Sequence, residues 1–290
     1  MKIIRALFFL GLWAFLGWAG YFCYHSASDG FNFRQIHSSL PSCPEFRVAL
    51  SDSKKEFLLE ILDQSYTYIG KGAQFYVFGS EDGEYVIKFF KHKHLRPLTW
   101  VKHFRLPQKV YTLAEEKNQR REQRVKQLFS SCKLAYEQME EETGVVYIHL
   151  DRHPTLRKKV TFHDKLGRSV LLEIDNHEFV IQKRAQTLEE VFAAHADQPG
   201  EIERDIESLL KLVVTRCQKG IADTDPAFVQ NIAFTQDGPI FVDIGQFKQD
   251  PKILSQEEQA KDLAIRLQDL HTWTNRHFPK LLPLIKKQTG

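Results

Sequence analysis

The feature that most constrains the fold is residues 223–245, where two short apolar runs flank a turn. Residues 232–234 and 239–242 are apolar, and Asp237-Gly238 stands between them. Asp-Gly between two such runs is typical of a β-hairpin, because both residues tolerate the backbone angles of a tight turn. The sequence therefore predicts two antiparallel strands here.

Polar side chains stand at the outer ends of this predicted hairpin. Asn231 directly precedes the first strand and Asp243 directly follows the second, while Asp223 and Asp225 lie in the preceding loop. Because a hairpin brings its outer ends together, we expect the Asn231 amide and the Asp243 carboxylate to converge. Amide and carboxylate oxygens suit Mg²⁺ or Mn²⁺, so the sequence predicts a metal site with Asp225 or Asp223 nearby.

Residues 66–90 predict three more strands joined by turns. Gly70 and Gly72 fall in the first turn, where glycine lets backbone N–H groups approach a phosphate closely. Lys88 lies among apolar residues of the third strand, in the sequence Tyr-Val-Ile-Lys. A lysine taken out of water needs an anionic partner. A plain turn and a solvated lysine are the ordinary alternatives when each feature stands alone.

Taken together and in this order, these features resemble the protein-kinase-like fold shared by protein kinases and aminoglycoside-type phosphotransferases. Residues 243–245, Asp-Ile-Gly, match the Asp-Phe-Gly motif of that family with one apolar replacement. The resemblance implies an α+β, two-lobed protein that binds ATP with Mg²⁺ or Mn²⁺. It implies that Gly70, Gly72 and Lys88 bind the nucleotide, and that Asn231 and Asp243 hold the metal.

The chain departs from the family pattern at two places. Phe75 stands where the third glycine of the loop is expected, and the His-Arg-Asp triplet is missing. The family's catalytic aspartate precedes its asparagine by five residues, but that position is Pro226, and Asp225 is one residue further away. A loop longer by one residue can still aim Asp225 at an acceptor hydroxyl, so Asp225 is the catalytic candidate.

The resemblance also assigns roles to the segments between these motifs. Residues 110–142 are polar and helical in character, and Glu122 is chosen over Glu115 and Glu116 as the partner of Lys88. Residues 179–182 predict the last strand before a hinge, whose backbone at residues 182–184 would face an adenine ring.

Four helices are expected after the hinge, at residues 188–194, 201–219, 262–273 and 278–285. Thr187 is suited to cap a short helix at residues 188–194. Residues 201–219 carry one apolar face of helical period and end at Gly220, which is typical of a helix C-terminus.

The sequence divides into four predicted segments. Residues 1–25 are an expected N-terminal membrane anchor, and residues 26–50 are a linker. Residues 51–184 form the N-terminal lobe with its basic insertion and long helix, and residues 185–290 form a short helical C-terminal lobe. Only 45 residues follow Gly245, which leaves no room for the peptide-binding platform of a protein kinase. A small-molecule, sugar or lipid acceptor is therefore expected.

Residues 6–24 are uncharged and strongly apolar. At about 1.5 Å per residue, a helix of this length nearly reaches across the roughly 30 Å hydrocarbon core of a bilayer. A cleaved signal peptide fits less well, because no small-x-small cleavage site follows the run. We therefore expect a single-pass N-terminal anchor. Lys2 and Arg5 precede it, which favours a cytoplasmic N-terminus and an outer domain, although ATP is a cytoplasmic substrate.

Composition excludes some partners. A net charge of +3 gives no reason to expect a nucleic-acid partner. The four cysteines show no zinc spacing, and their pairing cannot be deduced from sequence. Residues 91–109 form a basic stretch that is either a solvated surface loop or a contact with phosphate groups, such as anionic lipid.

Two functions thus stay open at the level of sequence. The first is ATP- and metal-dependent phosphotransfer by a membrane-anchored enzyme. The second is a catalytically inactive pseudokinase that binds a small-molecule or protein partner at the membrane, which the missing triplet and glycine favour. A third reading, a purely structural α+β domain, leaves the combination of Lys88, Asn231 and Asp243 unexplained.

Overall fold

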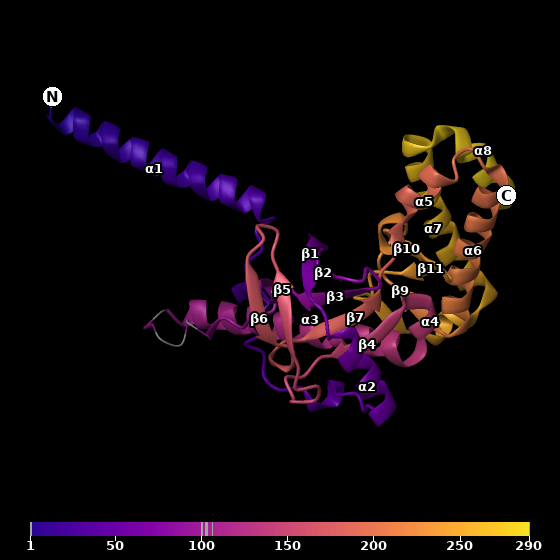
Figure 1. The fold of residues 1–290 in the computed structure, drawn as a ribbon, viewed down its shortest axis with the longest axis horizontal. Coiled ribbons are helices and arrows are strands. Elements are labelled where there is room, and N and C mark those ends of the chain that lie inside the picture. Colours follow the sequence, from indigo (N-terminus) through magenta and orange to yellow (C-terminus); the bar gives the residue numbers. More distant parts are fainter. Residues whose placement is uncertain (1, 100, 102–103, 106, 290) are drawn as a thin grey trace.

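The computed structural model describes residues 2–99, 101, 104–105 and 107–289. It shows a seven-stranded sheet flanked by helices and a smaller, mainly helical C-terminal part (Figure 1). The strands are β1 (Tyr66–Lys71), β2 (Phe75–Ser80), β3 (Tyr85–Phe90), β4 (Val145–His149), β5 (Lys159–His163), β6 (Ser169–Glu173), β7 (Phe179–Lys183), β8 (Gln186–Thr187), β9 (Ile221–Asp223), β10 (Ile232–Thr235), β11 (Gly238–Phe241) and β12 (Phe247–Gln249). The α-helices are α1 (Lys2–Ala27), α2 (Asp52–Ile61), α3 (Gln108–Gln138), α4 (Glu140–Thr143), α5 (Leu188–Ala194), α6 (Pro199–Gln218), α7 (Gln256–His277) and α8 (Leu282–Thr289). The predicted α+β class is confirmed.

The large sheet has the strand order β4-β7-β3-β2-β1-β5-β6. Its central strands are antiparallel, whereas β1 and β5 run parallel. Strands β2 and β3 are buried along nearly their whole length because both faces of the sheet are covered. Phe90 packs on Phe129 of α3 on one face, and Phe78 packs on Phe31 of the N-terminal segment on the other.

Residues 26–50, predicted to be a linker, pack against the sheet. Phe31 and Ile36 are buried, and the Ser38 hydroxyl donates a hydrogen bond of 2.7 Å to the buried carboxylate of Glu178. The buried apolar residues of this segment sit in irregular backbone without helical or strand period. Periodicity therefore could not reveal this packing.

Helix α1 projects away from the body of the molecule (Figure 1), and Trp13 and Trp18 on it are exposed. None of the helices that the structure describes is both long enough and apolar enough to cross a membrane. The predicted transmembrane anchor is therefore not supported.

Helix α5 has the predicted bounds, whereas α6 begins at Pro199 instead of residue 201, and α7 extends beyond the predicted 262–273 at both ends. The Thr187 side chain accepts a hydrogen bond from the Glu190 backbone N–H, and the Glu190 carboxylate accepts one from the Thr187 N–H, so α5 starts with a capping box. Helix α6 is followed by Gly220 at φ +72°, a left-handed conformation that glycine adopts without strain.

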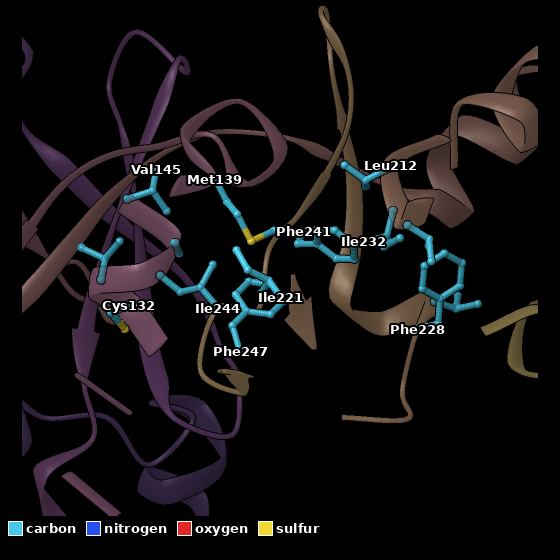
Figure 2. Close-up of a cluster of buried hydrophobic side chains, with 14 of the residues drawn as sticks. Cys132, Met139, Val145, Leu212, Ile221, Phe228, Ile232, Phe241, Ile244 and Phe247 are labelled. Carbon is cyan, nitrogen blue, oxygen red and sulfur yellow. The ribbon is translucent and has the colours of Figure 1, made fainter. Parts of the chain in front are cut away.

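One apolar core joins the sheet to the C-terminal part. Figure 2 shows Cys132 of α3, and Met139 at the end of that helix, near Ile244 and Phe247, with Phe228 and Ile232 further along the same cluster. Ile244 is fully buried. The turn that contains the Asp-Ile-Gly sequence is therefore fixed between α3 and the C-terminal strands.

Candidate active site

The hairpin brings Asn231 and Asp243 together as predicted. Strand β10 pairs antiparallel with β11, with Ile232 opposite Phe241. The Val242 N–H donates to the Asn231 carbonyl at 2.8 Å, which extends the ladder by one pair to the outer ends of the strands. Asn231 is buried, and Asp243 is the next residue after Val242.

Strand β3 delivers Lys88 to the same point. The Lys88 ammonium donates a hydrogen bond of 2.7 Å to the Val242 carbonyl. Lys88 is 8% exposed, and burial lowers its pKa to about 8, while the nearby Asp243 carboxylate opposes the shift. Three of the predicted site residues, Lys88, Asn231 and Asp243, therefore meet around the end of one hairpin.

Glu122 is not the partner of Lys88. Its carboxylate pairs with Lys126 at 3.0 Å on the exposed side of α3, and 65% of the Glu122 side chain is exposed. Cys132 of α3 lies near Lys88 instead, and burial raises the pKa of its thiol, which keeps it neutral. The prediction failed because the register of a 31-residue helix cannot be set from its charges.

Ser131 of α3 holds the turn that carries Asp243. Its hydroxyl donates to the Ile244 carbonyl at 2.5 Å and accepts from the Phe247 N–H at 2.7 Å. Within the turn, the Asp243 carboxylate accepts the Gly245 N–H at 3.0 Å. Ser131 is fully buried. Sequence analysis did not identify this residue, because a single serine in a long helix carries no local signal.

Gly72 lies in the β1–β2 connection as predicted, whereas Gly70, expected in the same turn, lies in β1 opposite Val77. An irregularity in the pairing of β1 with β2 falls at Gly70, and the Gly72 N–H donates to the Phe75 carbonyl at 3.0 Å. No neighbouring atom lies within 4 Å of the place where a Cβ would stand on Gly70 or Gly72. The space above these two glycines is therefore open.

The same turn folds down onto the Asp-Ile-Gly sequence. A Cβ on Gly245 would collide with the side-chain amide of Gln74. The side-chain oxygen Oε1 of Gln74 is buried without a hydrogen-bond partner among the described residues. Lys91 holds the backbone of the same turn. Its backbone N–H donates to the backbone carbonyl of Gln74 at 2.9 Å, and its ammonium donates to the backbone carbonyl of Gly72.

The loop that contains Asp223 and Asp225 is held from behind by α7. Buried Arg266 donates to the backbone carbonyls of both residues, at 2.8 Å to Asp223, and its guanidinium lies 3.5 Å from the Asp223 carboxylate. Burial raises the pKa of Asp223, and Arg266 opposes the shift. The Asp225 carboxylate accepts the Ala227 N–H at 2.9 Å and closes its own turn.

A second carboxylate of α7 orients the end of this loop. Asp269 accepts the N–H groups of Phe228 and Val229 at 2.8 and 2.9 Å, at the start of the short 3₁₀ turn Val229–Asn231. Asp269 and Arg266 lie three residues apart and so share one face of α7. That polar face, which the apolar pattern of the helix conceals, positions Asn231.

The hinge differs from the expectation. The N–H groups of Lys183 and Arg184 donate to the carbonyls of Gly144 and Glu84, each at 2.8 Å. Gln182 is fully buried, and its side-chain amide donates to the Phe241 carbonyl at 3.1 Å. These two backbone donors are therefore used within the fold and do not face an adenine site.

The donor set at the hairpin end fits a small divalent cation that also binds substrate phosphates. Among the described residues, no group of three or more His, Cys, Asp or Glu side chains could hold a metal ion. Mg²⁺ usually takes only one or two protein oxygen ligands beside water and phosphate oxygens. Asp243 and Asn231 supply a carboxylate and an amide oxygen of this kind.

No family model and no curated protein sequence matches the chain. Solved structures do resemble it, and two of them are named below. One is the bifunctional kinase-methyltransferase WbdD, 15% identical with a TM-score of 0.38 over 78% of this chain and 46% of that chain, so this chain spans less than half of WbdD. The other is the ADP-bound aminoglycoside phosphotransferase APH(2'')-Ib, 11% identical with a TM-score of 0.28 over 82% of this chain and 97% of that chain.

Similarities of this strength carry no argument about activity. The assignment of the fold rests on the order of the parts in the structure: the glycine turn, the strand lysine, α3, the hinge, α6, the Asp/Asn loop and the hairpin. Within that order, Lys88 meets the ends of the hairpin. This is the order that the sequence resemblance to protein-kinase-like proteins predicts.

Proposed function

We propose that this protein transfers a phosphoryl group from ATP to a small-molecule, sugar or lipid acceptor. The observation that carries the proposal is the convergence of Lys88, Asn231 and Asp243 at the end of the β10–β11 hairpin. Burial of the Lys88 ammonium costs desolvation free energy, and its pKa is lowered as a result. Buried ionisable groups with shifted pKa values are typical of binding and catalytic sites. The membrane location and the identity of the partner stay predictions.

Each residue has a defined part in this proposal. The Lys88 ammonium contacts the phosphates of the nucleotide, and the oxygens of Asn231 and Asp243 hold the divalent cation, which neutralises charge on the phosphates when bound. Asp225 orients the acceptor hydroxyl, and Arg266 fixes the Asp225 backbone for that purpose. Asp225 must give up its turn hydrogen bond to Ala227 to reach an acceptor.

Titration calorimetry with ATP, with and without Mg²⁺, tests the nucleotide site in the full chain. We expect Mg²⁺-dependent binding that Lys88→Met weakens by about tenfold or more, the usual worth of a charge-assisted hydrogen bond. Lys159→Met is the matched control, since Lys159 lies in β5 and pairs with Glu173 on the surface. Equal loss in both variants, or no ATP binding by the wild type, would overturn the proposal.

Binding should also weaken as the pH rises through 8. Lys88 is charged below its pKa of about 8 and neutral above it, so its attraction for phosphate fades between pH 8 and 9. We expect ATP affinity to fall by up to about tenfold over that unit, whereas Lys88→Met should show a flat profile. The pKa of Lys88 is about 8 in the folded state and 10.5 in its ordinary state. Between these two values the unfolded chain binds more protons at Lys88 than the folded chain does, so the free energy of unfolding rises with pH there. A parallel slope in the variant would contradict the assignment.

The inactive alternative has one specific observation in its favour. The Gln74 side chain fills the space next to Gly245, directly beside the predicted metal ligand Asp243. A pseudokinase that keeps this contact closed would serve as a partner-binding module and would not bind ATP. Removal of the Gln74 side chain distinguishes the two readings.

Gln74→Ala should tighten ATP·Mg²⁺ binding by about three- to tenfold if the protein is active. Closed molecules reduce the apparent affinity in proportion to their population, and the variant removes the side chain that stabilises the closed form. Gln127→Ala, on the neighbouring surface of α3, should leave ATP affinity unchanged. Titration calorimetry measures the ATP affinity of both variants and of the wild type. If none of the three binds ATP, the result favours the inactive module.

A further inference from the structure

A pocket of about 370 Å³ lies beside the site that holds Lys88 and the hairpin ends. Its walls come from the glycine turn, the segment after β3, the middle of α3 and the residues that follow Asp243. Lys91 and Arg124 supply two cations, and Gln74, Gln127 and Gln246 supply side-chain amides. Neither Lys88 nor Asp243 lines this pocket, so it adjoins the first site without containing it.

None of the described residues that line the pocket has a carboxylate. The ammonium of Lys91 donates to the neutral carbonyl of Gly72, and burial together with the nearby Lys71 lowers the pKa of Lys91. Arg124 forms none of the ion pairs found in the described part of the chain. Both cations in this pocket therefore lack an anionic partner.

Some of the other cations of α3 are paired with carboxylates of the same helix. Arg120 lies 3.9 Å from Glu116, and Lys126 lies 3.0 Å from Glu122. Arg124, like Lys109, Lys117 and Arg121 of the same helix, is in none of the ion pairs of the described residues. Arg124 differs from these cations in lining a pocket that it shares with Lys91.

We propose that this pocket binds a phosphate group, or a similar oxyanion, carried by the acceptor substrate. The planar guanidinium of Arg124 suits two parallel hydrogen bonds to phosphate oxygens, and Lys91 adds a point charge. The three amides can donate further hydrogen bonds, and the volume is within the range of small-ligand sites. Anion binding follows from the pocket alone, whereas the acceptor role rests on the proposed function.

The shared Gly245 and Gln74 place this anion next to the Asp-Ile-Gly turn. An acceptor anchored there by its own phosphate would present a hydroxyl close to the transferred group. The phosphate could belong to a soluble phosphate ester or to a lipid headgroup, since the chemistry of recognition is the same.

Calorimetric titration with inorganic pyrophosphate at constant ionic strength tests the pocket in the full chain. Wild type should bind, and Arg124→Gln should bind about tenfold or more weakly, because a charge-assisted hydrogen bond is lost. Lys126→Gln is the control, since it makes the same charge change two residues away on the opposite side of α3. Equal affinities in the two variants, or no binding by wild type, would overturn the proposal.

A second variant guards against an indirect effect of the first. Gln127→Glu places a carboxylate in the pocket without removing a cation, and it should weaken pyrophosphate binding in the same way. Unfolding temperatures without ligand should match the wild type, since both side chains are exposed. Wild-type affinity in Gln127→Glu would contradict the pocket assignment.

Two further measurements locate the anion and its source. If Lys88→Met abolishes pyrophosphate binding and Arg124→Gln does not, the anion occupies the nucleotide site and the pocket proposal fails. If pyrophosphate binding depends on Arg124 but ATP does not bind, the pocket stands and the proposed function fails. Competition by glucose 6-phosphate would identify a soluble ester, whereas competition only by phosphatidate vesicles would identify a lipid headgroup.

Discussion

Asp243→Ala is expected to abolish metal-dependent phosphotransfer, with a fall of at least about a hundredfold in the rate of ADP formation. Asp243 is the carboxylate that acts on Lys88 at the hairpin end, and in the proposed site its loss leaves the divalent cation without a carboxylate from this turn. The variant also removes the negative charge that supports the charged form of Lys88. The measurement is ADP release with ATP and Mg²⁺ as the only substrates, so that water serves as acceptor.

Asp237→Ala is the matched control for this prediction. Asp237 lies at the tip of the same hairpin, where its exposed carboxylate pairs with Lys183 at 2.7 Å. The control variant should keep the wild-type rate and the wild-type unfolding temperature. A similar rate in Asp243→Ala and the wild type would remove Asp243 from the metal site.

Arg266→Met is expected to cost about 3–5 kcal/mol of unfolding free energy. Arg266 is 3% exposed and contacts two loop carbonyls, the Asp223 carboxylate and, at 3.3 Å, the Asp262 carboxylate. Methionine keeps most of the side-chain volume but leaves these buried oxygens without their partner. Urea denaturation followed by circular dichroism measures the difference.

Lys261→Met provides the comparison on the same helix. Lys261 pairs with Glu257 and Glu258 on the exposed side of α7, where ion pairs contribute little. This variant should change the unfolding free energy by less than about 1 kcal/mol. An Arg266→Met protein as stable as the Lys261→Met protein would show that the Asp223–Asn231 loop is held by other contacts.

The sequence was sufficient for the parts of the site that depend on local pattern. The Asp-Gly turn between two apolar runs predicts the hairpin, and pairing of the strands then forces Asn231 and Asp243 together. Lys88 was identified because an ammonium group stands out in an otherwise apolar strand. These inferences need only the period of a strand and the geometry of a tight turn.

The remaining parts depend on contacts between segments far apart in the chain. Ser131 and Arg266 each reach the site from a long helix, and nothing in the adjacent residues indicates which turn of the helix faces it. The error at Glu122 has the same origin, because α3 carries many charges and most of them face water. Gln74 was overlooked since its role appears only when the glycine turn is folded onto Gly245.

The packed N-terminal segment shows another limit of pattern. Phe31 and Phe46 are buried although their segment has no regular secondary structure beyond short 3₁₀ turns. Periodicity detects faces of helices and strands, but it has no means to detect an irregular segment that covers a sheet. The basic stretch at residues 91–109 also lacks a regular apolar period. Residues 100, 102–103 and 106 of this stretch lie outside the described residues.

The most direct test of the account is a crystal structure of the full chain with Mn²⁺ and a non-hydrolysable ATP analogue, with the metal located by anomalous scattering. We predict a metal peak bound by an oxygen of Asp243 and the amide oxygen of Asn231, at about 2.0–2.2 Å. Lys88 should contact a phosphate, and Gln74 should have moved away from Gly245. A nucleotide bound elsewhere, or a metal without contact to Asn231 and Asp243, would contradict the account.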